Sequence, residues 1–225
     1  MKWDSGYIYE NTNFPAEPKV NFKVVLDKIK GQTGAKNLLD LGCASGEFVH
    51  YVNKFLPSLH CTGLDFNPDL IQRTKNNPKA SFRVGDILNL ELGQKFDIVT
   101  MIGVLTCFDD FKPIVDKMMA HTNKGGSIFV VSIFNDDDID VRLKFRNNTI
   151  SSDWQVGYNL FPISSVVDYA EQKGGKVTVS EIELPFDLAK QDDSLRSWTV
   201  RTDGGRYSLN GLMLLYRLKC VEIMV

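Results

Sequence analysis

The sequence predicts an α/β fold, in which a mostly parallel sheet carries helices on both of its faces. Strand-like and helix-like segments alternate between residues 20 and 134, and this alternation is the pattern of successive βαβ units. The segment 96–105 is an almost uninterrupted apolar run, as expected for a central strand that is buried on both faces. The apolar run 37–41 leads through a glycine-rich turn into a helical pattern, which predicts a ligand-binding turn at the start of a helix.

Each element is predicted from its local pattern. The first helix is expected over residues 20–30, where Phe22, Val25 and Ile29 keep a helical spacing. The sequence Asn123-Lys124-Gly125-Gly126 marks a stop and a turn before the fifth strand. The remaining strands are expected over 37–41, 59–64, 81–87, 96–105, 127–134, 176–184 and 212–224, and the remaining helices over 48–56, 68–75, 111–120 and 163–173.

The length of 225 residues fits a single domain with a sizeable core. Residues 1–33 are expected to form an N-terminal arm and a first helix that cover the cofactor or the substrate. Residues 34–225 are expected to form the domain itself, with insertions at about 135–160 and 185–210. The second insertion is long for a connection between two strands, and long ordered loops are usually functional.

Composition and charge exclude several classes of protein. The net charge of −2 argues against non-specific binding to nucleic acid, which needs a basic face. The four cysteines are scattered without a CxxC pair, so reduced thiols and a cytoplasmic location are the simpler interpretation. No apolar run is long enough to span a membrane, and the first residues do not form a signal peptide.

A glycine-rich motif follows the first expected strand. It reads Asp40-Leu41-Gly42-Cys43-Ala44-Ser45-Gly46. A dinucleotide-binding fingerprint would need glycine at positions 42, 44 and 47, and only Gly42 fits. The motif instead resembles the first motif of the class I S-adenosylmethionine-dependent methyltransferases, written D/E-x-G-x-G-x-G in that family, with Ala44 at the middle glycine.

Three further features agree with this resemblance, which covers about residues 35–135: an acid after the second expected strand, an acid after the third, and the apolar fourth strand at 96–105. Asp65 ends the second expected strand, where an acid can accept hydrogen bonds from a ribose diol. The third strand ends in Gly85-Asp86-Ile87, and the resemblance implies that Asp86 accepts from the adenine amino group while Ile87 packs on the ring. Each acid alone could be a helix cap or a turn residue. The resemblance implies a seven-stranded, Rossmann-like sheet with an antiparallel last strand, S-adenosylmethionine as cofactor, and a cofactor site formed by Asp40, Gly42, Cys43, Ala44, Ser45, Gly46, Asp65, Phe66, Asp86, Ile87, Ile102 and Gly103.

The catalytic group is harder to assign. Asp109 is the nearest carboxylate to the end of the fourth strand, where the methyl group is expected, so it is the candidate base. Asp109 or Asp110 can equally cap the following helix. The acidic run Asp136-Asp137-Asp138 could bind a divalent cation, but a solvated loop explains it as well, so no metal site is predicted.

The candidate acceptor-binding residues lie in the second insertion and in the N-terminal arm. Guanidinium groups pair with carboxylate or phosphate, so an arginine-bearing loop suggests an anionic acceptor. The same arginines could instead alternate on an exposed strand and pair with neighbouring acids. The candidates are Arg196, Trp198, Arg201 and Arg206, with Arg142 and Arg146 as further contributors, and Tyr7 beside Trp3 and Tyr9 in an arm that either closes over the pocket or packs on the surface.

The resemblance implies an enzyme that moves a methyl group to an oxygen or nitrogen of a small, anionic or sugar-like acceptor. The two expected insertions resemble those of stand-alone bacterial enzymes that act on small molecules. One alternative is a methyltransferase for RNA or protein. Against it, the chain lacks a basic patch. It also has Gly-Val-Leu-Thr at 103–106, where nucleobase amino methyltransferases often carry an Asn/Asp-Pro-Pro-aromatic tetrad. The other alternative is a non-catalytic protein that binds S-adenosylmethionine. The sequence leaves the oligomeric state open.

Overall fold

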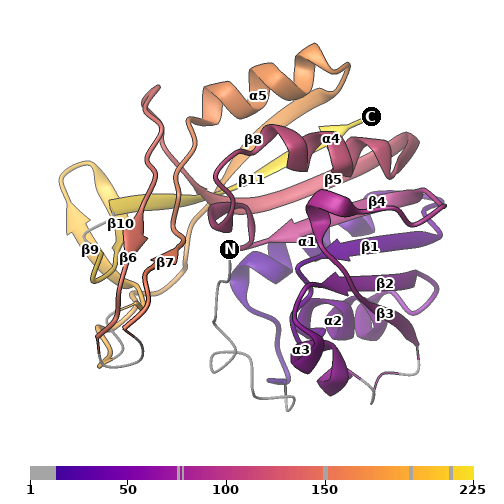
Figure 1. The fold of residues 1–225 in the computed structure, drawn as a ribbon, viewed down its shortest axis with the longest axis horizontal. Coiled ribbons are helices and arrows are strands. Elements are labelled where there is room, and N and C mark those ends of the chain that lie inside the picture. The colour runs from indigo at the N-terminus through magenta and orange to yellow at the C-terminus, as the bar shows by residue number, and fades with distance from the viewer. Residues whose placement is uncertain (1–13, 75–76, 78, 149–151, 193–194, 213–214) are drawn as a thin grey trace.

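The computed structural model describes residues 14–74, 77, 79–148, 152–192, 195–212 and 215–225. Its centre is a sheet with the strand order β3-β2-β1-β4-β5-β11, and β8 pairs with the other side of β11 (Figure 1). The first five strands run parallel, whereas β11 runs antiparallel to both β5 and β8. The predicted α/β sheet with an antiparallel last strand is confirmed. These strands are β1 (Asn37–Leu41), β2 (His60–Asp65), β3 (Ala80–Val84), β4 (Phe96–Ile102), β5 (Thr122–Phe134), β8 (Lys176–Ile182) and β11 (Leu215–Met224).

Helices cover both faces of the sheet because the buried strands are apolar on both sides. Leu38 on β1 packs in a core with α1 and α2, while its neighbour Leu39 packs in a second core with α4 and α5. Successive strand residues point to opposite faces, so one continuous apolar run supplies both cores. The helices are α1 (Val20–Lys30), α2 (Glu47–Phe55), α3 (Pro68–Arg73), α4 (Lys112–Ala120) and α5 (Ile163–Gln172).

Several strand boundaries differ from the sequence-based expectation. Strand β3 ends at Val84 rather than at residue 87, because a short 3-10 turn over Ile87–Asn89 follows, and β8 ends at Ile182 rather than at 184. Strand β4 ends at Ile102 rather than at residue 105, because Gly103 adopts φ +76° and a short 3-10 turn over Leu105–Cys107 follows. Strand β5 begins at Thr122 rather than at 127. The expected turn at 123–126 is instead an irregularity in its pairing with β4.

The two insertions add small β elements. The first contains β6 (Lys144–Phe145) and β7 (Gln155–Val156), which pair with each other. For the second, the sequence left a long loop and an exposed strand open, and the structure has the hairpin β9 (Trp198–Thr202) and β10 (Gly205–Leu209), with β10 paired to β11. Backbone pairing with β11 therefore extends the sheet. Figure 1 shows β6, β7, β9 and β10 on one side of the molecule, apart from β1–β3.

The expected first helix is confirmed as α1, which packs against α2 through Phe22 and Phe48, with ring centroids 5.2 Å apart. Trp3, Tyr7 and Tyr9 lie outside the described residues, so the expected covering role of the arm stays a prediction. Among the described residues, no helix is long and apolar enough to cross a membrane.

Candidate functional site

One large cavity lies at the carboxyl ends of the parallel strands. It has a volume of about 670 Å³, within the usual range for small-molecule sites. The turns after β1, β2, β3 and β4 all contribute to its wall. In open α/β sheets this edge is where ligands bind. All expected cofactor residues except Gly46 line it, namely Asp40, Gly42, Cys43, Ala44, Ser45, Asp65, Phe66, Asp86, Ile87, Ile102 and Gly103.

The glycine turn after β1 is held by its neighbour strand and by the conformations of its own residues. The N–H groups of Gly42 and Cys43 both donate to the carbonyl of Leu64, at 2.7 and 3.1 Å. Gly42 has φ +75°, and a Cβ at this position would overlap the side chain of Val104. Ala44 also has a positive φ, +49°, so it occupies the conformation that a glycine would adopt without steric cost.

Gly46 does not line the cavity and is the N-cap residue of α2. It has φ +83°, and a Cβ there would stand 2.9 Å from the ring of Phe82. Its function is therefore to let the chain enter the helix closely packed against β3.

Asp65 joins the turn after β2 to the glycine turn. Its carboxylate is 6% exposed and accepts hydrogen bonds from the N–H groups of Ala44 and Asn67, each at 2.9 Å. Burial raises the pKa of Asp65, and these backbone hydrogen bonds oppose the rise. A carboxylate has about four acceptor positions, so Asp65 keeps capacity for a further donor from the cavity.

Asp40 is a second buried acid on the wall. It is 3% exposed, and its Oδ1 accepts a hydrogen bond from the Thr100 hydroxyl at 2.8 Å. Burial raises the pKa of Asp40 to about 7, with a further contribution from the charge of Asp65. The cavity therefore contains two carboxyl groups whose ionisation a cationic ligand would favour.

The turn after β3 has an apolar wall with one acid. Phe66 and Leu88 are 51% and 44% exposed although both are large and apolar, and Ile87 is buried beside them. Asp86 accepts hydrogen bonds from the N–H of Leu88 and from Asn89 Nδ2, both at 3.0 Å. Asp86 therefore stabilises its own turn, which is the turn-residue role that the sequence also allowed, and it lines the cavity as well.

The loop after β4 forms the end of the cavity where the methyl group is expected. Phe108, Asp109 and Asp110 line it. Asp110 accepts a hydrogen bond at 2.9 Å from the N–H of Lys112, the first residue of α4, while Phe111 occupies the N-cap position. Burial raises the pKa of Cys107 to about 11, so this thiol stays protonated at neutral pH.

Several lining residues were not named individually from the sequence, although residues 1–33 as a segment were expected to cover the cofactor or the substrate. Lys19 and Phe22 come from the start of α1, Val156 comes from β7, and Glu47 opens α2 and forms an ion pair with Lys19. Packing between distant elements brings Lys19, Phe22 and Val156 to the cavity, whereas Glu47 directly follows the glycine motif. The helical spacing of Phe22 indicated burial in a core but not a place at a site.

The candidate acceptor-binding residues of the second insertion do not line this cavity. Arg201 forms hydrogen bonds to both carboxylate oxygens of Asp187, and Arg206 Nε lies 3.2 Å from the same carboxylate. Arg206 instead lines a separate cavity of about 330 Å³ that Ser197 and Thr199 share. Arg196 is exposed and Trp198 half-buried on the same insertion.

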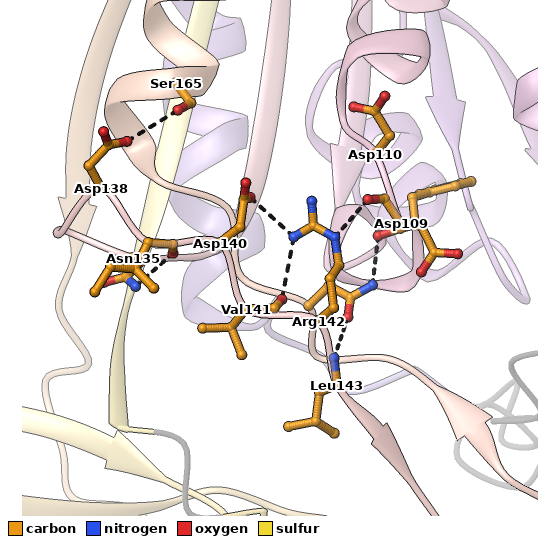
Figure 2. A network of polar contacts seen from close by, with 12 residues as sticks. Asp109, Asp110, Asn135, Asp138, Asp140, Val141, Arg142, Leu143 and Ser165 are labelled. Atoms are coloured by element: carbon orange, nitrogen blue, oxygen red, sulfur yellow. Dashed lines mark hydrogen bonds and ion pairs between the residues drawn. The ribbon is translucent and has the colours of Figure 1, made fainter.

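The arginines of the first insertion are also partnered. Arg142 donates to the carbonyl of Asp109 at 2.7 Å and pairs with Asp140, as Figure 2 shows. The Arg146 guanidinium lies 5.3 Å from the centre of the Trp154 ring.

The acidic run after β5 is held by other groups. Asp136 pairs with the buried Lys219 at 2.9 Å, and Asp138 accepts from the hydroxyl of Ser165 (Figure 2). Within the described ranges, no group of three or more His, Cys, Asp or Glu side chains is arranged to hold a metal ion.

Comparison with known proteins defines the class. A family model described as a methyltransferase domain matches residues 32–194. The chain belongs to this family, and the class I methyltransferase resemblance drawn from its motifs is confirmed.

Individual relatives are distant. A malonyl-[acyl-carrier protein] O-methyltransferase of Bacillus anthracis is 23% identical over 164 residues, which cover 69% of this chain and 61% of the relative. The putative methyltransferase 235L of Invertebrate iridescent virus 6 is 28% identical over 169 residues, covering 74% and 60%. The chain thus spans about three fifths of the length of these relatives.

Solved structures show the same fold. CalS10, an amino pentose methyltransferase from Micromonospora echinaspora whose structure has SAM bound, superposes with a TM-score of 0.61 at 18% identity, covering 96% of this chain and 99% of that one. A DhpI-SAM-HEP complex gives a TM-score of 0.62 at 13% identity, with 96% and 91% covered. At these identities the likeness establishes the architecture.

Proposed function

We propose that this domain binds S-adenosylmethionine in the large cavity and transfers its methyl group to a nitrogen or oxygen of a small molecule. The observation that carries the proposal is that residues from the turns after four different strands meet in one cavity of suitable size. The methyltransferase motifs of the sequence imply a cofactor role for residues in each of these four turns. The glycine turn is held in place by packing, because a side chain on Gly42 would overlap Val104 of the loop after β4.

The residues have distinct tasks in this proposal. Asp65 accepts a hydrogen bond from a ribose hydroxyl, and Ile87, Leu88 and Phe66 give the adenine an apolar surface. Asp40 lies next to the glycine turn and favours a positively charged ligand. When bound, S-adenosylmethionine supplies an electrophilic methyl group on a sulfonium.

Transfer then depends on placement and on exclusion of water. The loop after β4 presents Phe108 and Asp109 to the acceptor. Phe108 excludes water from the reacting atoms, and the Asp109 carboxylate accepts the proton that the acceptor nitrogen or hydroxyl loses.

The charges of the cavity favour an uncharged or amine-bearing acceptor over an anionic one. Among the described residues that line it, the acids are Asp40, Glu47, Asp65, Asp86, Asp109 and Asp110. Lys19 is the basic side chain among them, and it is paired with Glu47. At the acceptor end, a phosphate or carboxylate would therefore enter beside Asp109 and Asp110, with the cost that burial of an uncompensated charge carries.

The experiment is a measurement of S-adenosylhomocysteine release with matched sets of small molecules, for example glucosamine, glucose and glucose 6-phosphate. We expect release that depends on an acceptor, with amine-bearing members ahead of hydroxyl-only members and phosphorylated members last. Release that requires RNA or protein would favour the macromolecular alternative. Tight binding of S-adenosylmethionine with no acceptor-dependent release from a broad panel would contradict the enzymatic proposal.

A further inference from the structure

The loop after β4 is held by donors from the first insertion. Its carbonyl groups at Thr106 and Phe108 accept hydrogen bonds from Asn159, from the backbone N–H at 3.0 Å and from Nδ2 at 2.8 Å. The carbonyl of Asp109 accepts from Arg142 Nε at 2.7 Å (Figure 2). Phe108 and Asp109 are the residues that the proposed function places beside the acceptor. The insertion therefore fixes the backbone from which both side chains project.

Asn159 is the centre of this arrangement. It is fully buried, and its Oδ1 accepts a hydrogen bond from the N–H of Leu143 at 2.8 Å. Its side-chain amide thus connects Phe108 in the loop after β4 with Leu143 in the first insertion. Buried amides with both ends paired are strongly oriented, and an unpaired carbonyl left by truncation would cost about 1–3 kcal/mol.

The backbone around Asn159 is also constrained. The residue before it, Tyr158, has φ +57°, an unfavourable conformation for a side chain of this kind. The residue after it, Leu160, exchanges two backbone hydrogen bonds with Val141, at 2.9 and 3.0 Å. Such a conformation persists only where the surrounding contacts over-determine it.

We propose that Asn159 is a positioning residue for methyl transfer, which sets the place of Phe108 and Asp109 relative to the transferable methyl group. This inference rests on the proposed function. The hydrogen bonds of Asn159 reach Thr106, Phe108 and Leu143, and the glycine turn and Asp65 are held by separate bonds. Loss of the Asn159 side chain should therefore disturb the methyl and acceptor end while cofactor affinity is retained.

The test compares three variants of the full chain. Asn159→Ala removes the side-chain bridge. Arg142→Met removes the hydrogen bond to the Asp109 carbonyl. Methionine keeps an apolar side chain over Phe161, because the Arg142 guanidinium of wild type lies 4.6 Å from the centre of that ring. Asn210→Ala is the control, because Asn210 is also fully buried and accepts a backbone hydrogen bond, from Leu212 N at 3.0 Å. Unlike that of Asn159, its Nδ2 has no hydrogen-bond partner among the described residues, so it bridges no two segments. Calorimetry gives the Kd of S-adenosylhomocysteine, and NMR gives the signal of bound [methyl-¹³C]-S-adenosylmethionine.

We expect Asn159→Ala to keep the Kd of S-adenosylhomocysteine within about threefold of wild type and to shift or broaden the bound methyl signal. Arg142→Met should produce a smaller change of the same kind, and Asn210→Ala should produce neither. A methyl signal in Asn159→Ala that coincides with wild type would overturn the inference, and so would a parallel loss of S-adenosylhomocysteine affinity of about tenfold or more.

If Asn159→Ala does not fold, Arg142→Met decides the question by the same two measurements, and an unchanged methyl signal in that variant overturns the inference. A wild-type chain that binds neither ligand refutes the proposed function, and the positioning role with it. The two failures are therefore distinguishable.

Discussion

The cofactor end and the acceptor end of the cavity are built in different ways. The cofactor end consists of short turns that directly follow β1, β2 and β3, and the carbonyl of Leu64 on β2 holds the turn after β1. The acceptor end depends on distant residues. Asn159 is 51 positions from Phe108, and Arg142 is 33 positions from Asp109.

This difference indicates how changes at the two ends should act. A turn fixed by backbone conformation and close packing has little room to adjust, so substitutions there should abolish ligand binding. A loop that is fixed by side-chain donors from an insertion can shift without unfolding the sheet. Substitutions in the insertions should therefore leave cofactor binding intact. Variants in the turns and variants in the insertions test this difference between the two ends.

The largest effect is expected for Gly42→Ala. The new Cβ would overlap Val104 in a backbone at φ +75°. The left-handed conformation and the overpacking together should lower the free energy of unfolding by about 2–5 kcal/mol and abolish cofactor binding. Chemical denaturation and calorimetry measure the two effects.

Gly34→Ala is the control for this variant. Gly34 also has a positive φ, +89°, but a Cβ there would meet nothing within 4 Å. The free energy of unfolding of Gly34→Ala should fall only by the backbone contribution of about 1–2 kcal/mol, and the ligand affinity should be unchanged. Equal losses in the two variants would contradict the close-packing account of the turn.

Asp40→Asn should change the pH dependence of stability. Because burial raises the pKa of Asp40 to about 7, the folded protein holds this proton more tightly than the unfolded chain does. Wild-type stability should therefore fall as pH rises from about 4 to about 7, by up to about 4 kcal/mol. Asp40→Asn lacks this loss and should be more stable than wild type at pH 8, as measured by denaturation at several pH values.

Asp40→Asn should also change the pH dependence of ligand affinity. In wild type this affinity should rise with pH, whereas stability falls. A cationic ligand favours ionised Asp40, so wild-type affinity for S-adenosylmethionine should increase as pH rises through about 7. In Asp40→Asn this increase should be smaller. Identical pH profiles for affinity would show that Asp40 does not interact with the ligand.

The smallest effect is expected for Arg201→Ala in the second insertion. The Arg201 side chain is 66% exposed, and its ion pair with Asp187 is exposed to solvent. Such pairs contribute about 0–1 kcal/mol, so unfolding and S-adenosylhomocysteine affinity should be almost unchanged. A large loss of cofactor affinity in Arg201→Ala would contradict the separation of the two ends.

The sequence predicted the parallel sheet and most of the cofactor end because that information is local. Asp40, Gly42 and Asp65 stand at fixed positions relative to the strands that precede them, so an apolar run and the next few residues were enough. For the hairpin β9–β10 the sequence left two interpretations open, an acceptor-binding loop and an exposed strand whose arginines pair with acids. The structure has the strand, which is stabilised by pairing with β11, a contact outside the segment 185–210.

The acceptor end could not be predicted for a related reason. Val156 of the first insertion reaches the cavity wall, and Asn159 bonds to the loop after β4, only when this insertion packs on that loop. The pairing of Arg201 with Asp187 is likewise a contact between residues 14 positions apart. Charge type alone could not distinguish an acceptor site from an ion pair on the surface.

The most direct test of the central claim is calorimetry of S-adenosylmethionine and S-adenosylhomocysteine with wild type, Asp65→Ala and Asp69→Ala. Asp69 is an exposed acid on α3 that does not line the cavity. We expect micromolar binding by wild type and Asp69→Ala, and a loss of about tenfold or more in Asp65→Ala, since hydrogen bonds to charged groups contribute about 1.5–3 kcal/mol. Absence of binding to wild type, or equal affinity in Asp65→Ala, would contradict the proposal that this cavity is the cofactor site.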